Sequence, residues 1–166
     1  MTNQTLKLYE YHVWANRRVF EHLHQLPEEV WSQQTTSVFP SVGALMSHIY
    51  AMDGMWLSVM QEAPFDEARA LLMRLLEETK EVTLDELQER FERTAEDYRN
   101  FLASLDSNQA IAVAHPQYGS VQTPISELVQ HVVNHGTYHR GNLTAMLRQC
   151  GHPGVPTDYM FYLYTV

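Results

Sequence analysis

Histidine residues at helical spacing are the part of this sequence whose types and positions could do chemistry. His135 and His139 lie four positions apart, and in a helix this spacing places two imidazoles on one face with about 6 Å of rise between them. Two ligands rarely hold a metal ion in water, so a third must come from another segment. His48, in a separate predicted helix, offers it. Three neutral imidazoles would hold one divalent ion and leave a coordination position open, as reactive metal sites do.

A chain with nine histidines contains some pairs at this spacing by chance. The angular position of each histidine on its helix therefore decides whether it can belong to a shared metal site. At about 100° per residue, His139 lies inside the apolar arc of its predicted helix and His135 borders it. His131 lies off this arc and about 12 Å from His139 along the axis, too far to share an ion. His48 is flanked by apolar residues on its own helix. We therefore predict His48, His135 and His139 as the metal ligands.

The elements that must position these side chains are predicted helices. Apolar residues at helical spacing predict long helices at about 4–25, 41–61, 84–105 and 124–150, and a shorter one at about 66–78. Thr83 with Glu86 forms a capping box for the third long helix. Thr123 and Pro124 are predicted to begin the fourth as its cap and first residue, and Gly151 to end it. Residues 115–120 predict a turn, in a small irregular or hairpin segment before the last helix.

This set of elements predicts an all-α fold, a four-helix bundle in a single domain spanning residues 1–166. The predicted connection at about 61–83 is long enough to cross the bundle, so a simple up-down-up-down order does not follow. Helical bundles build metal sites from side chains on facing helices, which agrees with the predicted histidine site.

Composition limits the functions that the chain can have. The net charge is −9, and residues 62–97 hold twelve acidic and five basic residues. This balance argues against binding nucleic acid or an anionic membrane surface, because both need a basic footprint. The sequence has no apolar run long enough to span a membrane and no secretion signal. The single cysteine, Cys150, fits a reducing compartment, so we expect a cytoplasmic protein and assign this residue no chemistry.

Several catalytic motifs are absent. The segment from His135 to His139 has the spacing of a metalloprotease helix but lacks the glutamate that serves as general base in that mechanism. No Glu-x-x-His motif occurs on paired helices, which counts against a di-iron carboxylate bundle. No general base is identifiable near the histidines in the sequence, so a catalytic residue is not assigned.

Four segments carry a resemblance to a known family. They are Tyr11 to Arg17 with its Trp-Ala-Asn run, Val42 to Trp56, His131 to Gly141, and Gly151 to Tyr159. With these motifs, the sequence resembles the DinB family over nearly its whole length. That family comprises damage-inducible-type metal-binding bundles related to bacillithiol- and mycothiol-dependent S-transferases. The segment from His131 to Gly141 is the most specific of the four.

The resemblance implies a DinB/YfiT-like four-helix bundle in an atypical helix order, often dimeric, with one divalent ion held by three histidines. The family's ligands fall on His48, His135 and His139, the same three that helix phase selects. Asp53 departs from the pattern, because a glutamate is expected there in many relatives. It lies at the edge of the apolar stripe and is assigned no catalytic role.

Two functions remain open at this point. In the first, the open metal position activates a small ligand, as a thiol S-transferase or a hydrolase would, with a low-molecular-weight thiol as partner. In the second, the chain is a non-catalytic metal-binding protein of stress response or interaction. A purely structural ion is disfavoured because closed sites normally have four protein ligands. Zinc and nickel are the first candidates for the metal, and iron and manganese are alternatives.

Four further side chains are interpreted by position alone. Tyr11 and Trp14 are expected in the core of the first helix, and Asn16 is expected as a buried, hydrogen-bonded amide. Arg140, beside His139, is expected in a surface salt bridge rather than in contact with an anionic substrate.

Overall fold

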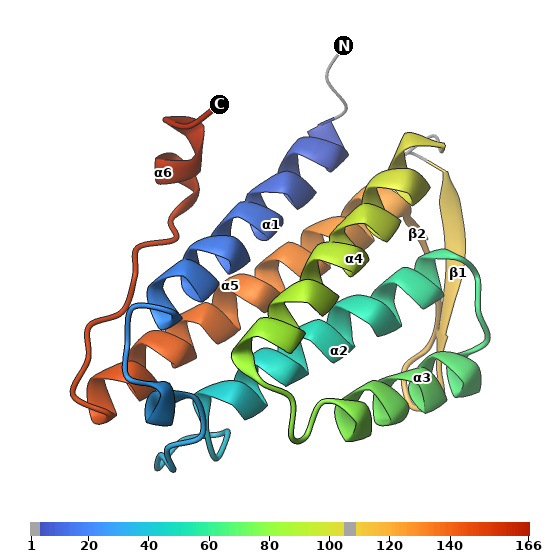
Figure 1. The fold of residues 1–166 in the computed structure, drawn as a ribbon. Helices are drawn as coiled ribbons and strands as arrows, with labels where there is room; N and C mark the ends of the chain where they lie inside the picture. Colours follow the sequence, from blue (N-terminus) through green and yellow to red (C-terminus); the bar gives the residue numbers. More distant parts are fainter. Residues whose placement is uncertain (1–3, 105–108) are drawn as a thin grey trace.

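The computed structural model describes residues 4–104 and 109–166. Four long helices form a bundle, which confirms the predicted all-α fold (Figure 1). The elements in chain order are α1 (Gln4–Leu23), the 3₁₀ helix η1 (Glu28–Trp31), α2 (Val42–Met60), α3 (Phe65–Glu78), α4 (Leu84–Ala103), β1 (Ala110–His115), β2 (Gly119–Pro124), α5 (Ile125–Gln149) and α6 (Tyr159–Leu163). Neither η1 nor α6 was predicted from the sequence.

The order of the helices departs from a simple up-and-down bundle because α3 runs back along α2 (Figure 1). As a result, α4 begins at the end of the bundle where α2 begins, and the two helices run in the same direction (Figure 1). Helix α5 packs against both α1 and α2, and α4 also contacts both. The long crossover predicted between the second and third long helices is therefore helix α3 and its two connections.

Local sequence explains where the main helices begin and end. Ser41 caps α2 by accepting a hydrogen bond from the Ala44 amide, and the Thr83–Glu86 capping box forms as predicted at α4. Gly151 follows α5 with φ +85°, a left-handed conformation that favours glycine. The third predicted helix extended to position 105, which lies outside the described residues.

The start of α5 differs from the prediction. Thr123 belongs to strand β2 and pairs with Ile111 of β1, so it does not cap the helix. Its hydroxyl donates to the Glu127 carboxylate instead. Pro124, predicted as the first helical residue, is the N-cap residue and makes no side-chain hydrogen bond there. The helix therefore begins at Ile125, one residue later than predicted. The predicted hairpin is confirmed as the antiparallel pair β1–β2, whose last pair joins His115 with Gly119.

Helix α2 is buried over more of its circumference than a single apolar stripe predicts. Met46, Asp53 and Met60 are buried, whereas the apolar side chains Met52 and Trp56 are partly exposed. The reason is tertiary packing, since α3, α4 and α5 all lie against this helix. The helix that carries His48 is thus packed against three other helices.

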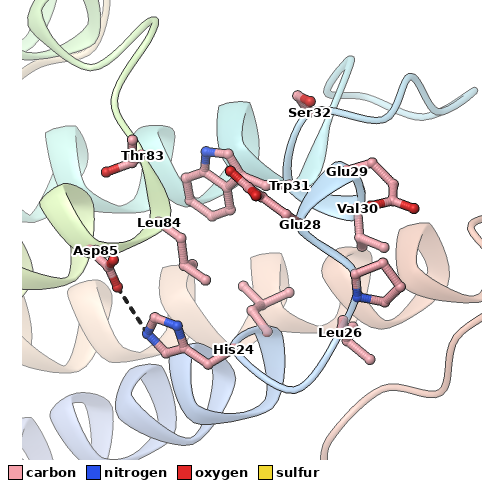
Figure 2. A pocket seen from close by; sticks show the side chains of 12 residues that line it. His24, Leu26, Glu28, Glu29, Val30, Trp31, Ser32, Thr83, Leu84 and Asp85 are labelled. Atoms are coloured by element: carbon pink, nitrogen blue, oxygen red, sulfur yellow. Dashed lines mark ion pairs between the residues drawn. The ribbon is translucent and has the colours of Figure 1, made fainter.

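A cavity of about 640 Å³ lies where the end of α1, η1 and the start of α4 meet (Figure 2). The Trp31 indole lies beside it and is fixed by a hydrogen bond to the Val82 carbonyl oxygen. His24 lies 3.6 Å from the Asp85 carboxylate across the same cavity (Figure 2). None of the three predicted metal ligands lines this space. The histidine site is therefore a separate feature of the fold.

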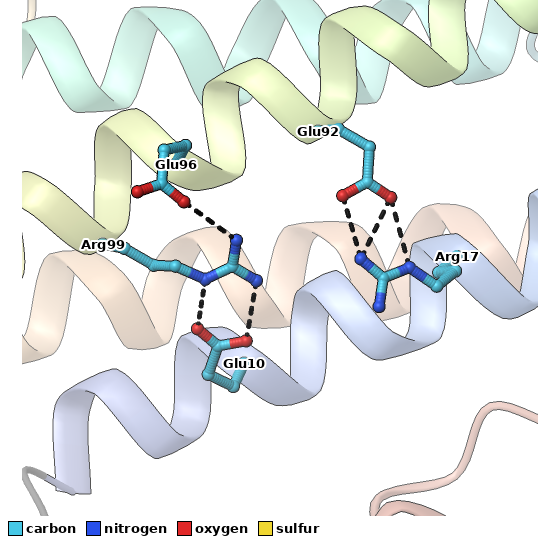
Figure 3. A network of polar contacts seen from close by, with 5 residues as sticks. All are labelled: Glu10, Arg17, Glu92, Glu96 and Arg99. Atoms are coloured by element: carbon cyan, nitrogen blue, oxygen red, sulfur yellow. Dashed lines mark hydrogen bonds and ion pairs between the residues drawn. The ribbon is translucent and has the colours of Figure 1, made fainter.

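Ion pairs hold α1 and α4 together on the outside of the bundle (Figure 3). Arg99 donates two hydrogen bonds to Glu10, at 2.7 and 3.0 Å, in a two-point geometry. Arg17 makes a similar contact with Glu92, about two turns along the helices from the Arg99–Glu10 pair. Glu92, from the acidic segment 62–97, is thus used for helix pairing. Among the described residues, no helix combines the length and the apolar character needed to cross a bilayer.

Candidate metal centre

Three histidine side chains from two helices converge on one point. His48 comes from α2, and His135 and His139 come from α5. The Nε2 atom of His135 lies 3.2 Å from that of His48 and 3.0 Å from that of His139. Two imidazole nitrogens bound to one ion at about 2.1 Å lie about 3.0 to 3.4 Å apart in octahedral or tetrahedral geometry. The described side chains are therefore placed to hold a metal ion.

Hydrogen bonding alone does not satisfy this cluster. Each neutral imidazole has one N–H and one lone pair, yet three Nε2 atoms face one another. The Nδ1 atoms of His135 and His139 are buried and have no hydrogen-bond partner within the described protein. Whichever tautomers are chosen, at least one buried donor or acceptor stays unpaired, at a cost. A cation at the point of convergence would use all three Nε2 lone pairs, so the donor set fits a metal.

Burial keeps these imidazoles in the neutral form that binds metal. Desolvation lowers the pKa of His135 to about 3, with a further contribution from the neighbouring histidines. Desolvation also lowers the pKa of His139 to about 4, and it lowers the pKa of His48. All three side chains are thus uncharged at neutral pH, and no proton has to be removed before an ion binds.

Aromatic rings surround the histidine cluster. The Phe39 ring packs against His48 and His139, with centroid distances of 4.9 and 5.4 Å. Tyr138 lies 5.1 Å from His139 and is largely exposed. Phe39 thus packs on one part of the cluster, and the exposed Tyr138 ring places an aromatic group beside it at the surface.

His131 does not join the cluster, in agreement with the prediction from helix phase. Its side chain is exposed, and its ring packs edge-on against Trp56 at 4.5 Å. The His131 ring centroid lies 6.3 Å from that of His135. The structure therefore brings together the three predicted residues and leaves the fourth histidine of this region outside.

Sequence reasoning missed a buried polar group behind the metal ligands. His12 and Asp53 are 1% and 2% exposed, and their side chains are 2.8 Å apart. Arg140 is 3% exposed, so its predicted surface salt bridge is wrong; it donates to Asn16, which is buried as predicted. Helix phase could have placed Arg140 near the core, but its partners on α1, His12 and Asn16, lie more than one hundred positions away in the sequence.

The two expected aromatic residues of α1 behave as core side chains. Tyr11 is buried and donates a hydrogen bond from its hydroxyl to the Thr157 carbonyl oxygen. Trp14 is partly buried and packs against Tyr162 of α6. Cys150 is partly buried, caps the end of α5 and is a free thiol. None of these three residues belongs to the histidine cluster.

Taken together, the fold and the histidine cluster define a helical bundle with a candidate three-histidine metal site. The family model for the DinB family matches residues 1–165. The chain is 44% identical over 165 residues to protein DinB of Bacillus subtilis (strain 168), covering 99% of this chain and 96% of that protein. The chain therefore belongs to the DinB family, as the sequence motifs indicated.

A solved structure supports the fold. The crystal structure of a DinB-like protein from Bacillus cereus ATCC 10987 matches with a TM-score of 0.67 at 18% sequence identity. The match covers 93% of this chain and 96% of that one. At this level of identity the likeness concerns the arrangement of the helices.

Proposed function

We propose that the protein binds a divalent metal ion through His48, His135 and His139 and keeps a coordination position open for a small ligand. The observation that carries this proposal is the convergence of three Nε2 atoms from two helices, with separations of 3.0 and 3.2 Å between neighbours. The open position follows from the donor set, because the cluster contains three residues and closed structural sites normally have four.

A thiol is the ligand class that this site favours. When bound, a divalent ion with an open position lowers the pKa of a coordinated water or thiol. The described cluster contains no carboxylate to act as a general base. A thiol, with an ordinary pKa of about 8.5, needs less help to lose its proton than water does. We therefore place thiol S-transfer before hydrolysis, with a low-molecular-weight thiol as the nucleophile.

The remaining features of the proposal follow from charge and family. Zinc and nickel are the first candidates for the ion, and iron and manganese are alternatives that imidazole also accepts. The net charge of −9 disfavours nucleic acid and anionic membranes as partners. We also propose a homodimer in the cytoplasm, from the resemblance to the family and from the single free cysteine.

Cobalt(II) substitution combined with thiol titration tests the proposal. The protein loaded with cobalt(II) should develop a thiolate-to-cobalt charge-transfer band that saturates with added thiol. His131→Ala is the matched control, because it removes a neighbouring histidine outside the cluster and should leave the band unchanged. His139→Ala should abolish it. A cobalt-loaded protein whose spectrum does not respond to any small thiol would refute thiol binding.

The second candidate function is metal binding without turnover, in stress response or as an interaction module. It is favoured by the same absence of a carboxylate in the cluster. The two functions differ in one measurement, the consumption of thiol when an electrophile is added to the metal-loaded protein. Consumption faster than in His139→Ala supports the transferase. Saturable thiol binding with no consumption supports the non-catalytic role.

A further inference from the structure

A chain of buried polar side chains joins the helices that carry the metal ligands. Arg140 of α5 contacts His12 and Asn16 of α1, and His12 contacts Asp53 of α2. All four side chains are nearly inaccessible to solvent. We refer to Arg140, His12, Asn16 and Asp53 as the buried polar chain. It begins on the residue after one metal ligand, His139, and ends on the helix of another, His48.

The His12 ring lies between the two ends of the buried polar chain, Arg140 and Asp53. Arg140 Nη1, a donor, lies 3.4 Å from His12 Nδ1. His12 Nε2 lies 2.8 Å from Asp53 Oδ2 and 3.0 Å from Asn16 Nδ2. Arg140 Nη1 also donates to Asn16 Oδ1 at 2.9 Å, which orients that amide. The imidazole of His12 therefore links the buried Arg140 to the buried Asp53.

The contact between His12 and α5 depends on a glycine inside the metal-ligand segment. A Cβ atom at Gly136 would lie 2.3 Å from His12 Cε1 and 2.5 Å from His12 Nδ1. Gly136 directly follows the ligand His135. The next residue, Thr137, accepts a hydrogen bond from Arg140 Nη2 at 3.0 Å. The buried polar chain thus touches α5 at three positions that lie between or beside its two metal ligands.

Fold stability gives little reason for such a chain. Removing charges from water is costly, and apolar residues of similar volume often stabilise a core as well or better. The buried polar chain instead fixes the relative position of α1, α2 and α5, because its hydrogen bonds form only at one arrangement of these helices. That position is the one at which the three Nε2 atoms converge.

We infer that Arg140, His12 and Asp53 are positioning residues of the metal centre, which fix α5 against α2 so that the three imidazoles meet at the distance an ion needs. This inference rests on the proposed metal-binding function. Loss of a group that hydrogen-bonds a metal ligand directly lowers affinity by about 10- to 100-fold, and because the buried polar chain acts through the position of the helices, we expect the lower end of this range.

Charge-removing variants separate positioning from stability. Asp53→Asn and Arg140→Met each leave one buried charge without its partner, so both should destabilise the apo protein and weaken zinc binding at least about tenfold. The double variant leaves no unpaired charge, so its stability should recover toward wild type. Its zinc affinity should stay about tenfold lower, because the link between α5 and α2 is still missing.

The matched control is Ser47→Ala. It removes a buried hydrogen bond from α2 to the Thr79 carbonyl oxygen, next to His48 but outside the buried polar chain. This variant should lose stability and keep wild-type zinc affinity. Affinity is measured by competition with a chelator at fixed pH, unfolding of the apo protein by circular dichroism, and ligand geometry by the cobalt(II) ligand-field spectrum.

The outcomes are distinct. A folded double variant with wild-type zinc affinity and an unchanged cobalt(II) spectrum would overturn the inference, as would affinity that follows stability across all variants including Ser47→Ala. If Asp53→Asn, Arg140→Met and the double variant do not fold, the zinc affinity of Arg140→Lys is measured instead. This variant keeps the charge and loses the two-point contact with Asn16 and Thr137, so its zinc affinity should also be about tenfold lower. Wild-type protein that binds no divalent ion would instead refute the proposed metal centre itself.

Discussion

Substituting alanine for Gly136 is expected to destabilise the protein, although helix propensity alone predicts the opposite. Glycine inside a helix costs about 1 kcal/mol relative to alanine. At Gly136, however, the new Cβ would lie 2.3 Å from His12 Cε1 and 2.8 Å from Arg140 Nη1. Real Cβ atoms essentially never come this close to another atom, so the His12 ring must retreat.

The size of the loss follows from what the ring must give up. His12 needs to move by roughly 1 Å to restore van der Waals contact, and crowding of this kind costs about 1–3 kcal/mol. The movement also stretches the 2.8 Å hydrogen bond to Asp53, and a hydrogen bond to a charged group contributes about 1.5–3 kcal/mol. Against the gain in helix propensity, the net loss in unfolding free energy is about 1.5–5 kcal/mol.

Gly141→Ala is the matched control on the same helix. No atom lies within 4 Å of a Cβ built at Gly141, so this variant should gain about 1 kcal/mol and raise Tm by roughly 2–4 °C. Gly136→Ala should lower Tm by roughly 3 °C or more in the same thermal unfolding experiment on apo protein. If both variants were stabilised equally, the contact between His12 and α5 would not exist in solution.

Three further predictions concern the ligands, pH and a helix cap. His131→Ala should keep the wild-type metal content and His139→Ala should lose it; the reverse result in elemental analysis would show that the phase of α5 is wrong. Burial lowers the pKa of His135 to about 3 and of His139 to about 4, so the unfolded chain binds more protons than the apo fold below about pH 6.5. The stability of the apo protein in urea should therefore fall as pH decreases from about 6.5 toward 4. Metal should stay bound well below pH 6.5, and release of the metal near pH 6 would contradict this prediction. Thr83→Ala should lower the unfolding free energy by about 0.5–2 kcal/mol through loss of the capping box, whereas Thr83→Ser, measured in parallel, should stay close to wild type.

The long helices and the histidine cluster could be predicted from sequence because both depend on local periodicity. Apolar residues at helical spacing locate α1, α2, α4 and α5, and phase on α5 separates His139 from His131. The capping box of Thr83 is a local signal too. These features need no knowledge of which helices touch.

The parts that sequence reasoning missed depend on tertiary contacts. Arg140 looks like a surface residue beside His139 until α1 supplies Asn16 and His12 as partners. Asp53 lies at the edge of one apolar stripe, and it is buried because α2 is packed on several sides. Helices η1 and α6 are too short for periodicity to detect, with four and five residues. Thr123 was displaced from its predicted cap because strand pairing with Ile111 extends to that residue.

Elemental analysis of the protein purified without a histidine tag tests the central claim most directly. The wild-type chain should carry close to one divalent ion per chain after exposure to a mixture of zinc, nickel, iron and manganese salts and removal of free metal. His48→Ala, His135→Ala and His139→Ala, all folded by circular dichroism, should each lose it. A wild-type chain that retains no ion, or single variants that retain the full content, would contradict the assignment of these three histidines as a metal centre.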